Sequence, residues 1–206
     1  MTRIIHIISD SNIGGAGRCL VNYLRCHDDI GWGLDYPMLR RWGMEEVPHK
    51  KYLNDFFRGF TGDAARGELY NEDPVTGDAR LCGTTASLCG MESAQTPEEM
   101  DRALACNTML HAWMLTQSGI PVLYSGDEVG QLNDYSYHAD PEKCVDSRYL
   151  HRGNFDWEQA ELRKNPDTNQ GKLFAALGQL EKIRASEAVF RADAKVSTFD
   201  TGSDHI

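Results

Sequence analysis

The sequence predicts an α/β protein, and three stretches of it carry this prediction. The apolar, β-branched run at residues 3–9 is typical of a buried parallel strand. Residues 96–119 have the start and stop signals of a helix. A short apolar strand at residues 120–124 follows that helix directly and leads into glycine and two acidic residues. Helix, tight turn, strand and acidic loop form one step of an α/β architecture.

Residues 1–24 predict a strand, a glycine-rich loop and the start of a helix. The loop contains Gly14, Gly15 and Gly17. This layout directs backbone N–H groups and a helix N-terminus towards a phosphate. The loop lacks the full G-x-G-x-x-G pattern and the lysine of a P-loop. A turn that serves only tight strand–helix packing explains it equally well.

The next part of the chain predicts a helix followed by a long loop. Residues 45–60 read as an amphipathic helix because four apolar residues recur at helical spacing, namely Leu53, Phe56, Phe57 and Phe60. Residues 61–90 are rich in Gly, Asp and Thr and contain a turn signal at NEDPVTGDAR. We therefore expect a long loop there, and such loops in compact domains are usually functional.

The helix at residues 96–119 is defined at both ends. Thr96 is its expected N-cap, Pro97 its first residue and Glu99 the acid of a capping box. Gly119 ends the helix, and the proline two residues later prevents its return.

The last third of the chain predicts one further helix between irregular segments. Residues 133–160 are polar and rich in turn residues. A helix is expected at about 168–185, with one apolar face made by Leu173, Leu177, Leu180 and Ile183. Residues 194–206 predict a strand and a hairpin turn, and a strand without a following partner suggests truncation.

Composition limits the classes of function. The chain has 206 residues and a formal net charge of −10, which argues against a nucleic-acid surface. Its opening apolar run is too short for a signal peptide, and no stretch approaches the length of a membrane span. No two cysteines form a C-x-x-C pair, so we expect reduced thiols, no metal site, no cofactor and a cytoplasmic location. The cysteines are at positions 19, 26, 82, 89, 106 and 144.

Acidic residues follow two of the predicted strands, in the sequences HDD and GDE. In α/β barrels, residues at the C-terminal ends of the strands build the active site, which would bring together Asp28, Asp29, Asp127 and Glu128. Carboxylates bind sugar hydroxyls, and glycoside chemistry requires a carboxylate beside the developing positive charge. Taken singly, each acidic pair fits a helix cap or a solvated turn as well.

Four motifs in order resemble the α-amylase family of glycoside hydrolases and transglucosidases, in its amylosucrase-like branch, from about residue 21 to 206. VNYLRCHDDIGW is similar to the seventh-strand motif of that family, and DPVTGDARLCGTTASLCG to the loop on the acceptor side. GIPVLYSGDEVGQLND is similar to the eighth-strand motif, and DSRYLHR to the substrate-binding segment that follows it. The resemblance implies an incomplete (β/α)8 barrel that holds the last two β/α units.

The resemblance also implies roles on the donor side of the site. Asp28 would be the carboxylate that stabilises the transition state by gripping the distorted glucosyl unit. His27 would hydrogen-bond the glucosyl hydroxyls. Arg148 would lie at the bottom of the donor pocket, paired with an acid from an earlier part of the barrel.

On the acceptor side, Asp29 would help to shape the subsite, and Arg80 would contact the acceptor glucan or fructosyl unit. Lys50 would make a similar contact, although the matching place in the family holds an arginine. Asp127 and Glu128 would be structural rather than catalytic.

The resemblance is incomplete at both ends. Family members work by retention, with a nucleophile and an acid/base that precede the seventh strand, and no G-x-R-x-D-A motif occurs in this chain. Residues 1–24 instead resemble the start of a family 4 GT-B glycosyltransferase. We expect residues 25–190 to be the C-terminal part of an amylase-type barrel, and 191–206 to begin a truncated β-domain. Such a partial barrel predicts a poorly closed core with exposed apolar surface.

These implications predict α-glucosyl transfer or hydrolysis on sucrose or α-glucans at the level of the family. This chain is expected to be an inactive fragment, since it has neither the nucleophile nor the acid/base. A nucleotide-sugar glycosyltransferase fragment and a non-catalytic sugar-binding fragment are the alternatives. The sequence does not predict the oligomeric state.

Overall fold

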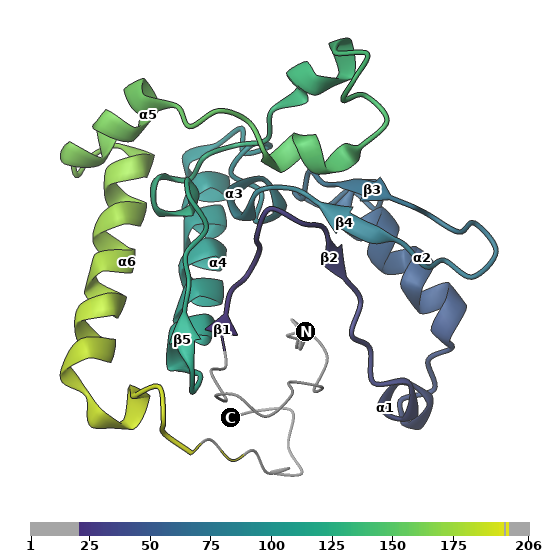
Figure 1. Cartoon of the computed structure of the whole chain (residues 1–206), viewed down its shortest axis with the longest axis horizontal. Coiled ribbons are helices and arrows are strands. Elements are labelled where there is room, and N and C mark those ends of the chain that lie inside the picture. Colours follow the sequence, from purple (N-terminus) through teal and green to yellow (C-terminus); the bar gives the residue numbers. More distant parts are fainter. Residues whose placement is uncertain (1–20, 196, 198–206) are drawn as a thin grey trace.

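The computed structural model describes residues 21–195 and 197, and it has a mixed α/β architecture with two small sheets (Figure 1). The strand expected at residues 3–9 and the glycine loop after it lie outside the described residues, as does almost all of the strand and hairpin expected at 194–206. The α/β class is confirmed.

The first sheet is a parallel pair. It joins β1 (Val21–Asn22) to β5 (Ile120–Pro121), with Val21 opposite Ile120. The N–H of Val122 donates to the carbonyl of Asn22 across the pair at 2.8 Å. A parallel pair requires a long crossover, and here the crossover contains the second sheet and the long helix α4 (Pro97–Thr116). Within the described residues, no further strand pairs with β1 or β5.

The second sheet is antiparallel, in the strand order β2–β4–β3. Its strands are β2 (Ile30–Gly31), β3 (Glu68–Tyr70) and β4 (Arg80–Cys82). Residues 61–90 were expected to be one long loop, and this is wrong, because they form β3, β4 and the short helix α3 (Thr85–Leu88). Three-residue strands are too short for an alternating pattern to reveal. The expected turn between them is present, with the Asp73 side chain accepting from the N–H of Val75 at 2.8 Å.

The two long helices follow their sequence signals closely. In α4, Thr96 and Glu99 form the expected capping box, and Pro97 is the first helical residue. The helix α6 (Asn169–Ser186) matches the helix expected at 168–185. Its Leu173 and Leu177 are buried as expected, whereas Ile183 is exposed.

The helix expected at residues 45–60 is α2 (Glu46–Phe57), and it is shorter at its C-terminal end. Gly59 follows the helix with φ +76°, a left-handed conformation that ends the helical path. Phe60 therefore leaves the predicted apolar face and is 65% exposed.

The remaining elements are short. Residues 133–160 are turn-rich as expected and contain two 3₁₀ helices. The short helices are α1 (Tyr36–Arg41), η1 (Asp127–Val129), η2 (Tyr135–Ala139), η3 (Ser147–His151), α5 (Trp157–Glu161), η4 (Leu162–Lys164) and η5 (Ala188–Phe190).

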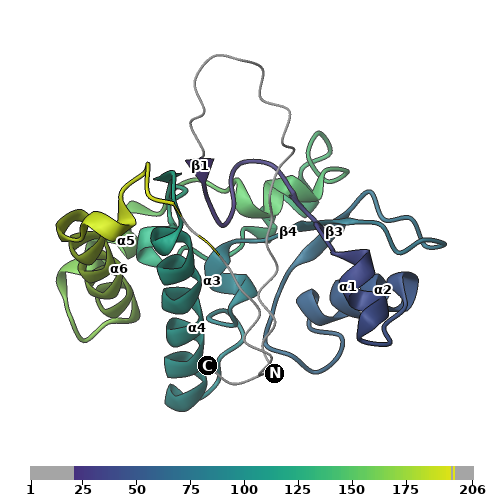
Figure 2. The ribbon, with the colours of Figure 1, turned by 90° about the horizontal axis from the view of Figure 1, so that it is seen from below.

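Two views show how these elements are arranged. The helices α4 and α6 lie side by side in one half of the molecule, and the β2–β4–β3 sheet with α1 and α2 forms the other (Figures 1 and 2). The segment between β1 and β2 crosses from one half to the other (Figure 1).

The described core consists of two separate hydrophobic clusters. The larger one lies between α3, α4 and α6, and its buried members are Ala86, Met91, Ala103, Leu104, Leu173 and Leu177. The smaller one joins Cys82, Tyr137 and Leu150.

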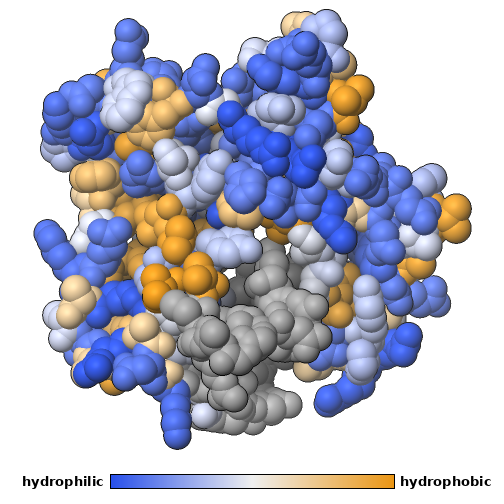
Figure 3. Space-filling model, in the orientation of Figure 1, coloured by the Kyte–Doolittle hydropathy of each residue, from blue (hydrophilic) through white to orange (hydrophobic). Residues whose placement is uncertain are grey.

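Apolar residues of the parallel pair remain exposed, and hydrophobic side chains reach the surface around β5 (Figure 3). Exposed apolar surface was expected, and it is present at these residues. Within the described part of the chain, no helix combines the length and apolar character needed to cross a membrane.

Candidate functional site

A buried ion pair fastens the loop after β1 to η1, the short helix that follows β5. Arg25 Nε lies 2.8 Å from Asp127 Oδ1, and both side chains are almost fully buried. The guanidinium also stacks over the Tyr124 ring at 4.5 Å, and Thr85 Oγ1 donates to Asp127 Oδ2 at 3.2 Å. Asp127 was expected to approach an exposed rim, and this is wrong, because its carboxylate is enclosed by these partners. Its position fits the structural role that the family resemblance implied.

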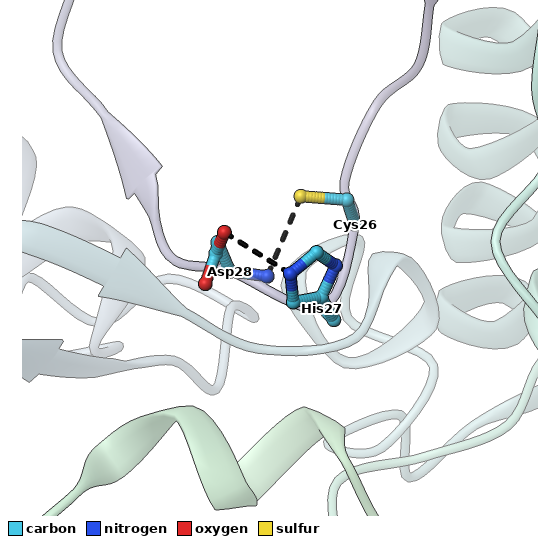
Figure 4. A group of neighbouring side chains, drawn as sticks. All are labelled: Cys26, His27 and Asp28. Atoms are coloured by element: carbon cyan, nitrogen blue, oxygen red, sulfur yellow. Dashed lines mark hydrogen bonds and ion pairs between the residues drawn. The ribbon is translucent and has the colours of Figure 1, made fainter.

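Asp28 projects from this loop with half of its side chain exposed. Its Oδ1 lies 3.3 Å from Arg152 Nη2 and 3.7 Å from Arg148 Nη1. Its Oδ2 faces Nε2 of His27 at 3.2 Å, so the two oxygens have different neighbours (Figure 4). The carboxylate is held by cations on one side and is open to solvent on the other.

Arg148 is held by an acid two residues before it. Asp146 accepts from Nε and Nη2 of Arg148, both at 2.8 Å, and the guanidinium lies over the Tyr70 ring at 4.7 Å. The hydrogen bond from Arg148 lowers the pKa of Asp146, and the same contact raises the pKa of Arg148. The sequence analysis expected Arg148 to pair with an acid from an earlier part of a barrel. In this structure its partner is Asp146, the residue directly before η3.

Asp29 and Arg80 face each other across the second sheet. Arg80 pairs with Gly31 in the β2–β4 register, which places its guanidinium beside the chain entering β2. Its Nε lies 3.8 Å from Asp29 Oδ1. The predicted residues of the loop after β1, of β4 and of η3 therefore meet in one place.

Lys50 does not join this group. Its Nζ lies 2.6 Å from Asp78 and 2.7 Å from Glu46, and its side chain is buried beneath the Tyr36 ring. Burial acts to lower the pKa of Lys50, but the hydrogen bonds that Lys50 donates to Asp78 and Glu46 outweigh this effect and raise the pKa. Lys50 fastens α2 to the turn before β4, so the expected contact with an acceptor sugar is wrong for this structure.

Two residues of this candidate site that the sequence analysis did not single out are His151 and Arg152. Arg152 Nε donates to the carbonyl of His27, as does His151 Nε2 at 3.3 Å. Arg152 also pairs with Asp28 through Nη2. Both His151 and Arg152 lie in the motif DSRYLHR, which was the available signal.

His151 is neutral in the folded chain. Its Nδ1 accepts the N–H of Gly83 at 3.1 Å, which leaves no room for a proton on that nitrogen. Burial and, after it, the charge of Arg25 together lower the pKa of His151 to about 4. Arg152 also lowers this pKa, while the His27 carbonyl and Asp146 act to raise it.

We expect acid to destabilise the chain through His151. The unfolded chain protonates this histidine below its ordinary pKa of about 6.5, while the folded chain does so only near 4, so stability is lost as the pH falls through that window. The free energy of unfolding should fall by about 2 kcal/mol between about pH 7 and about pH 5. Urea unfolding at the two pH values measures this. His151→Asn retains an acceptor for the N–H of Gly83, so its free energy of unfolding should fall much less between these pH values. An equal fall in both proteins would show that His151 is not the group responsible.

The described cysteines form no disulfide with one another. Burial raises the pKa of Cys82 to about 12, so that thiol is inert.

The arrangement can bind a polyhydroxylated ligand. It combines the exposed carboxylate of Asp28 with guanidinium donors and with the aromatic rings of Tyr70 and Tyr149, which stack under Arg148 and Arg152. Carboxylates and arginines hydrogen-bond hydroxyl groups, and aromatic faces pack against the apolar faces of sugars. A comparison of the chain with models of known protein families finds no match.

Proposed function

We propose that this chain carries the donor-side half of an α-glucosyl transfer site that acts on sucrose or α-glucans. The observation that supports this most is the convergence of three separate segments. His27, Asp28 and Asp29 after β1, Arg80 on β4 and Arg148 on η3 were selected from sequence motifs, and ion pairs of 3.2–3.8 Å link them.

In this proposal Asp28 is the carboxylate that grips the glucosyl unit. Retaining glycosidases pass through a transition state with positive charge at the anomeric carbon, which a nearby carboxylate stabilises. Arg148 and Arg152 hold Oδ1, so Oδ2 is left to accept hydrogen bonds from sugar hydroxyls. His27 stands beside Oδ2 as a second partner for those hydroxyls.

We propose that the 206-residue chain by itself binds such sugars without turning them over. Retaining chemistry needs a second carboxylate as nucleophile and a third group as acid/base. The carboxylate of Asp127 is buried in its pair with Arg25 and cannot reach a ligand. A non-catalytic sugar-binding surface is therefore the function that we assign to the isolated chain.

Asp28→Asn should weaken the binding of sucrose or of a linear α-1,4-glucan oligosaccharide at least about tenfold, because it removes charge-assisted hydrogen bonds. Isothermal titration or ligand-observed NMR measures the affinity. Glu161→Gln is the matched control: its carboxylate is 53% exposed against 51% for Asp28, and it also lies between two cations, Arg163 and Lys164.

The control variant should bind the sugars as the unaltered chain does. Equal loss in both variants, or no binding by the unaltered chain, would contradict a sugar site at Asp28. Release of glucose or fructose from sucrose by the purified chain would overturn the assignment of binding without turnover.

A further inference from the structure

Three consecutive side chains converge at the bend after β1. The ligand atoms of Cys26, His27 and Asp28 all lie within 4.8 Å of one another (Figure 4). Consecutive side chains in an extended chain point to opposite faces, so this convergence depends on the bend at residues 27 and 28. It presents a sulfur, an imidazole nitrogen and a carboxylate oxygen on one side of the loop.

The spacing of these atoms is close to that of a zinc site. Zinc binds nitrogen and oxygen at about 2.0–2.2 Å, so two such ligands in a tetrahedron lie about 3.4 Å apart. His27 Nε2 and Asp28 Oδ2 lie 3.2 Å apart. Sulfur binds at about 2.3 Å, so Sγ has to approach the other two ligands by about 1 Å. A change in the Cys26 rotamer allows this, because the three side chains are at least partly exposed.

The surroundings already orient the three ligands. Arg152 lies against Asp28 Oδ1 and the His27 carbonyl, which leaves Oδ2 and the imidazole free to turn towards a metal. The N–H of Asp28 donates to Cys26 Sγ at 3.4 Å, which holds the sulfur beside the other two ligands. Partners of this kind fix metal ligands in their binding geometry.

The positive charge nearby is largely neutralised. Arg148 is paired with Asp146 through two hydrogen bonds of 2.8 Å. Arg80 faces Asp29. Among the cations around Asp28, Arg152 lies nearest to its carboxylate, at 3.3 Å. The negative charge of a Cys26 thiolate would offset the positive charge of Arg152.

We propose that Cys26, His27 and Asp28 bind a divalent zinc-class cation through Sγ, Nε2 and Oδ2, with water in the fourth position. Binding removes the proton from the Cys26 thiol and releases it to solvent, so the sulfur bonds to the metal as a thiolate. Mixed sulfur, nitrogen and oxygen ligands favour zinc over magnesium or calcium. No metal site was expected because the chain has no C-x-x-C pair. Three adjacent ligands of different types do not form that pattern.

Cobalt(II) is the probe for this site. The purified full chain, freed of metal with a chelator and titrated with Co²⁺ under reducing conditions, should develop a thiolate-to-cobalt charge-transfer band and intense visible bands, and Zn²⁺ should abolish both. Cys26→Ser should remove the charge-transfer band. His27→Gln, at a side chain that is 68% exposed, should retain the fold and weaken Co²⁺ binding at least about tenfold.

Cys144→Ser is the matched control, because Cys144 is an exposed thiol elsewhere on the surface. Its spectrum should equal that of the unaltered chain. Loss of the band in this variant, or its persistence in Cys26→Ser, would overturn the site. The titration is done without sugar, and the absorption spectrum reports the metal ligands directly, so failure of the metal site and failure of sugar binding are distinguishable.

Discussion

Asp127→Ala is expected to lower the free energy of unfolding by about 3–5 kcal/mol, because it leaves a buried guanidinium without its carboxylate. The side chains of Arg25 and Asp127 are 2% and 1% exposed, so water cannot replace the lost partner. The substitution also removes the acceptor of Thr85. Urea denaturation followed by circular dichroism measures the change.

Two comparisons separate the effect of the buried charge from a general loss of packing. The double variant Arg25→Met, Asp127→Leu should recover much of the loss, since replacing both partners with apolar groups removes the unpaired charge. Glu161→Gln breaks an exposed pair and should change stability little. If Asp127→Ala lowered the free energy of unfolding no more than Glu161→Gln, the Arg25–Asp127 pair would not hold η1 to the loop after β1.

The same pair positions the candidate site. Arg25 directly precedes the residues proposed to bind metal and sugar, and its Nη1 lies 3.5 Å from the His151 carbonyl, next to Arg152. A chain that loses Asp127 therefore loses the anchor of the bend at residues 27 and 28. We expect such a chain to bind both Co²⁺ and sugar more weakly even where it remains folded.

The sequence predicted those elements that are determined by contacts between residues close together in the chain. The ends of α4 were predicted because Thr96, Pro97 and Glu99 determine a helix start through contacts within one turn. The strands β3 and β4 were missed because three residues are too few to show an alternating pattern, and their stability comes from burial of residues such as Leu81. Phe60 was assigned to a helix because the periodicity continued past Gly59, where the backbone turns away.

The candidate site divides in the same way. His27, Asp28, Asp29, Arg80 and Arg148 were found through motifs, and the structure brings them together. Lys50 matched a motif position, but its environment depends on Glu46 and Asp78, which lie on different elements. Arg25 gave no signal at all, because a lone arginine in a sequence reads as a surface residue until its buried partner is known.

Gly171→Ala and Gly178→Ala are expected to change stability in opposite directions, although both glycines lie in α6. By helix propensity alone, alanine is better than glycine by about 1 kcal/mol at either position. At Gly178 a Cβ meets nothing within 4 Å, so the gain of about 1 kcal/mol should be realised. At Gly171 a Cβ would lie 1.9 Å from the carbonyl oxygen of Asn165 and 2.7 Å from its carbon, and both are backbone atoms. We expect Gly171→Ala to cost about 3 kcal/mol, because the loop before α6 has to move away from the helix.

The cost at Gly171 should appear at the start of α6 in particular. Thr168 caps this helix by accepting the N–H of Gly171 at 3.0 Å, and displacement of the Asn165–Pro166 backbone moves that cap. Thermal unfolding of the two variants measures the difference, and hydrogen exchange should show faster opening at the first turn of α6 in Gly171→Ala alone. Equal stabilisation by both substitutions would mean that the loop yields without cost and that helix propensity alone governs this helix. A loss at Gly171 together with a gain at Gly178 would show that the close approach of residue 165 requires glycine there.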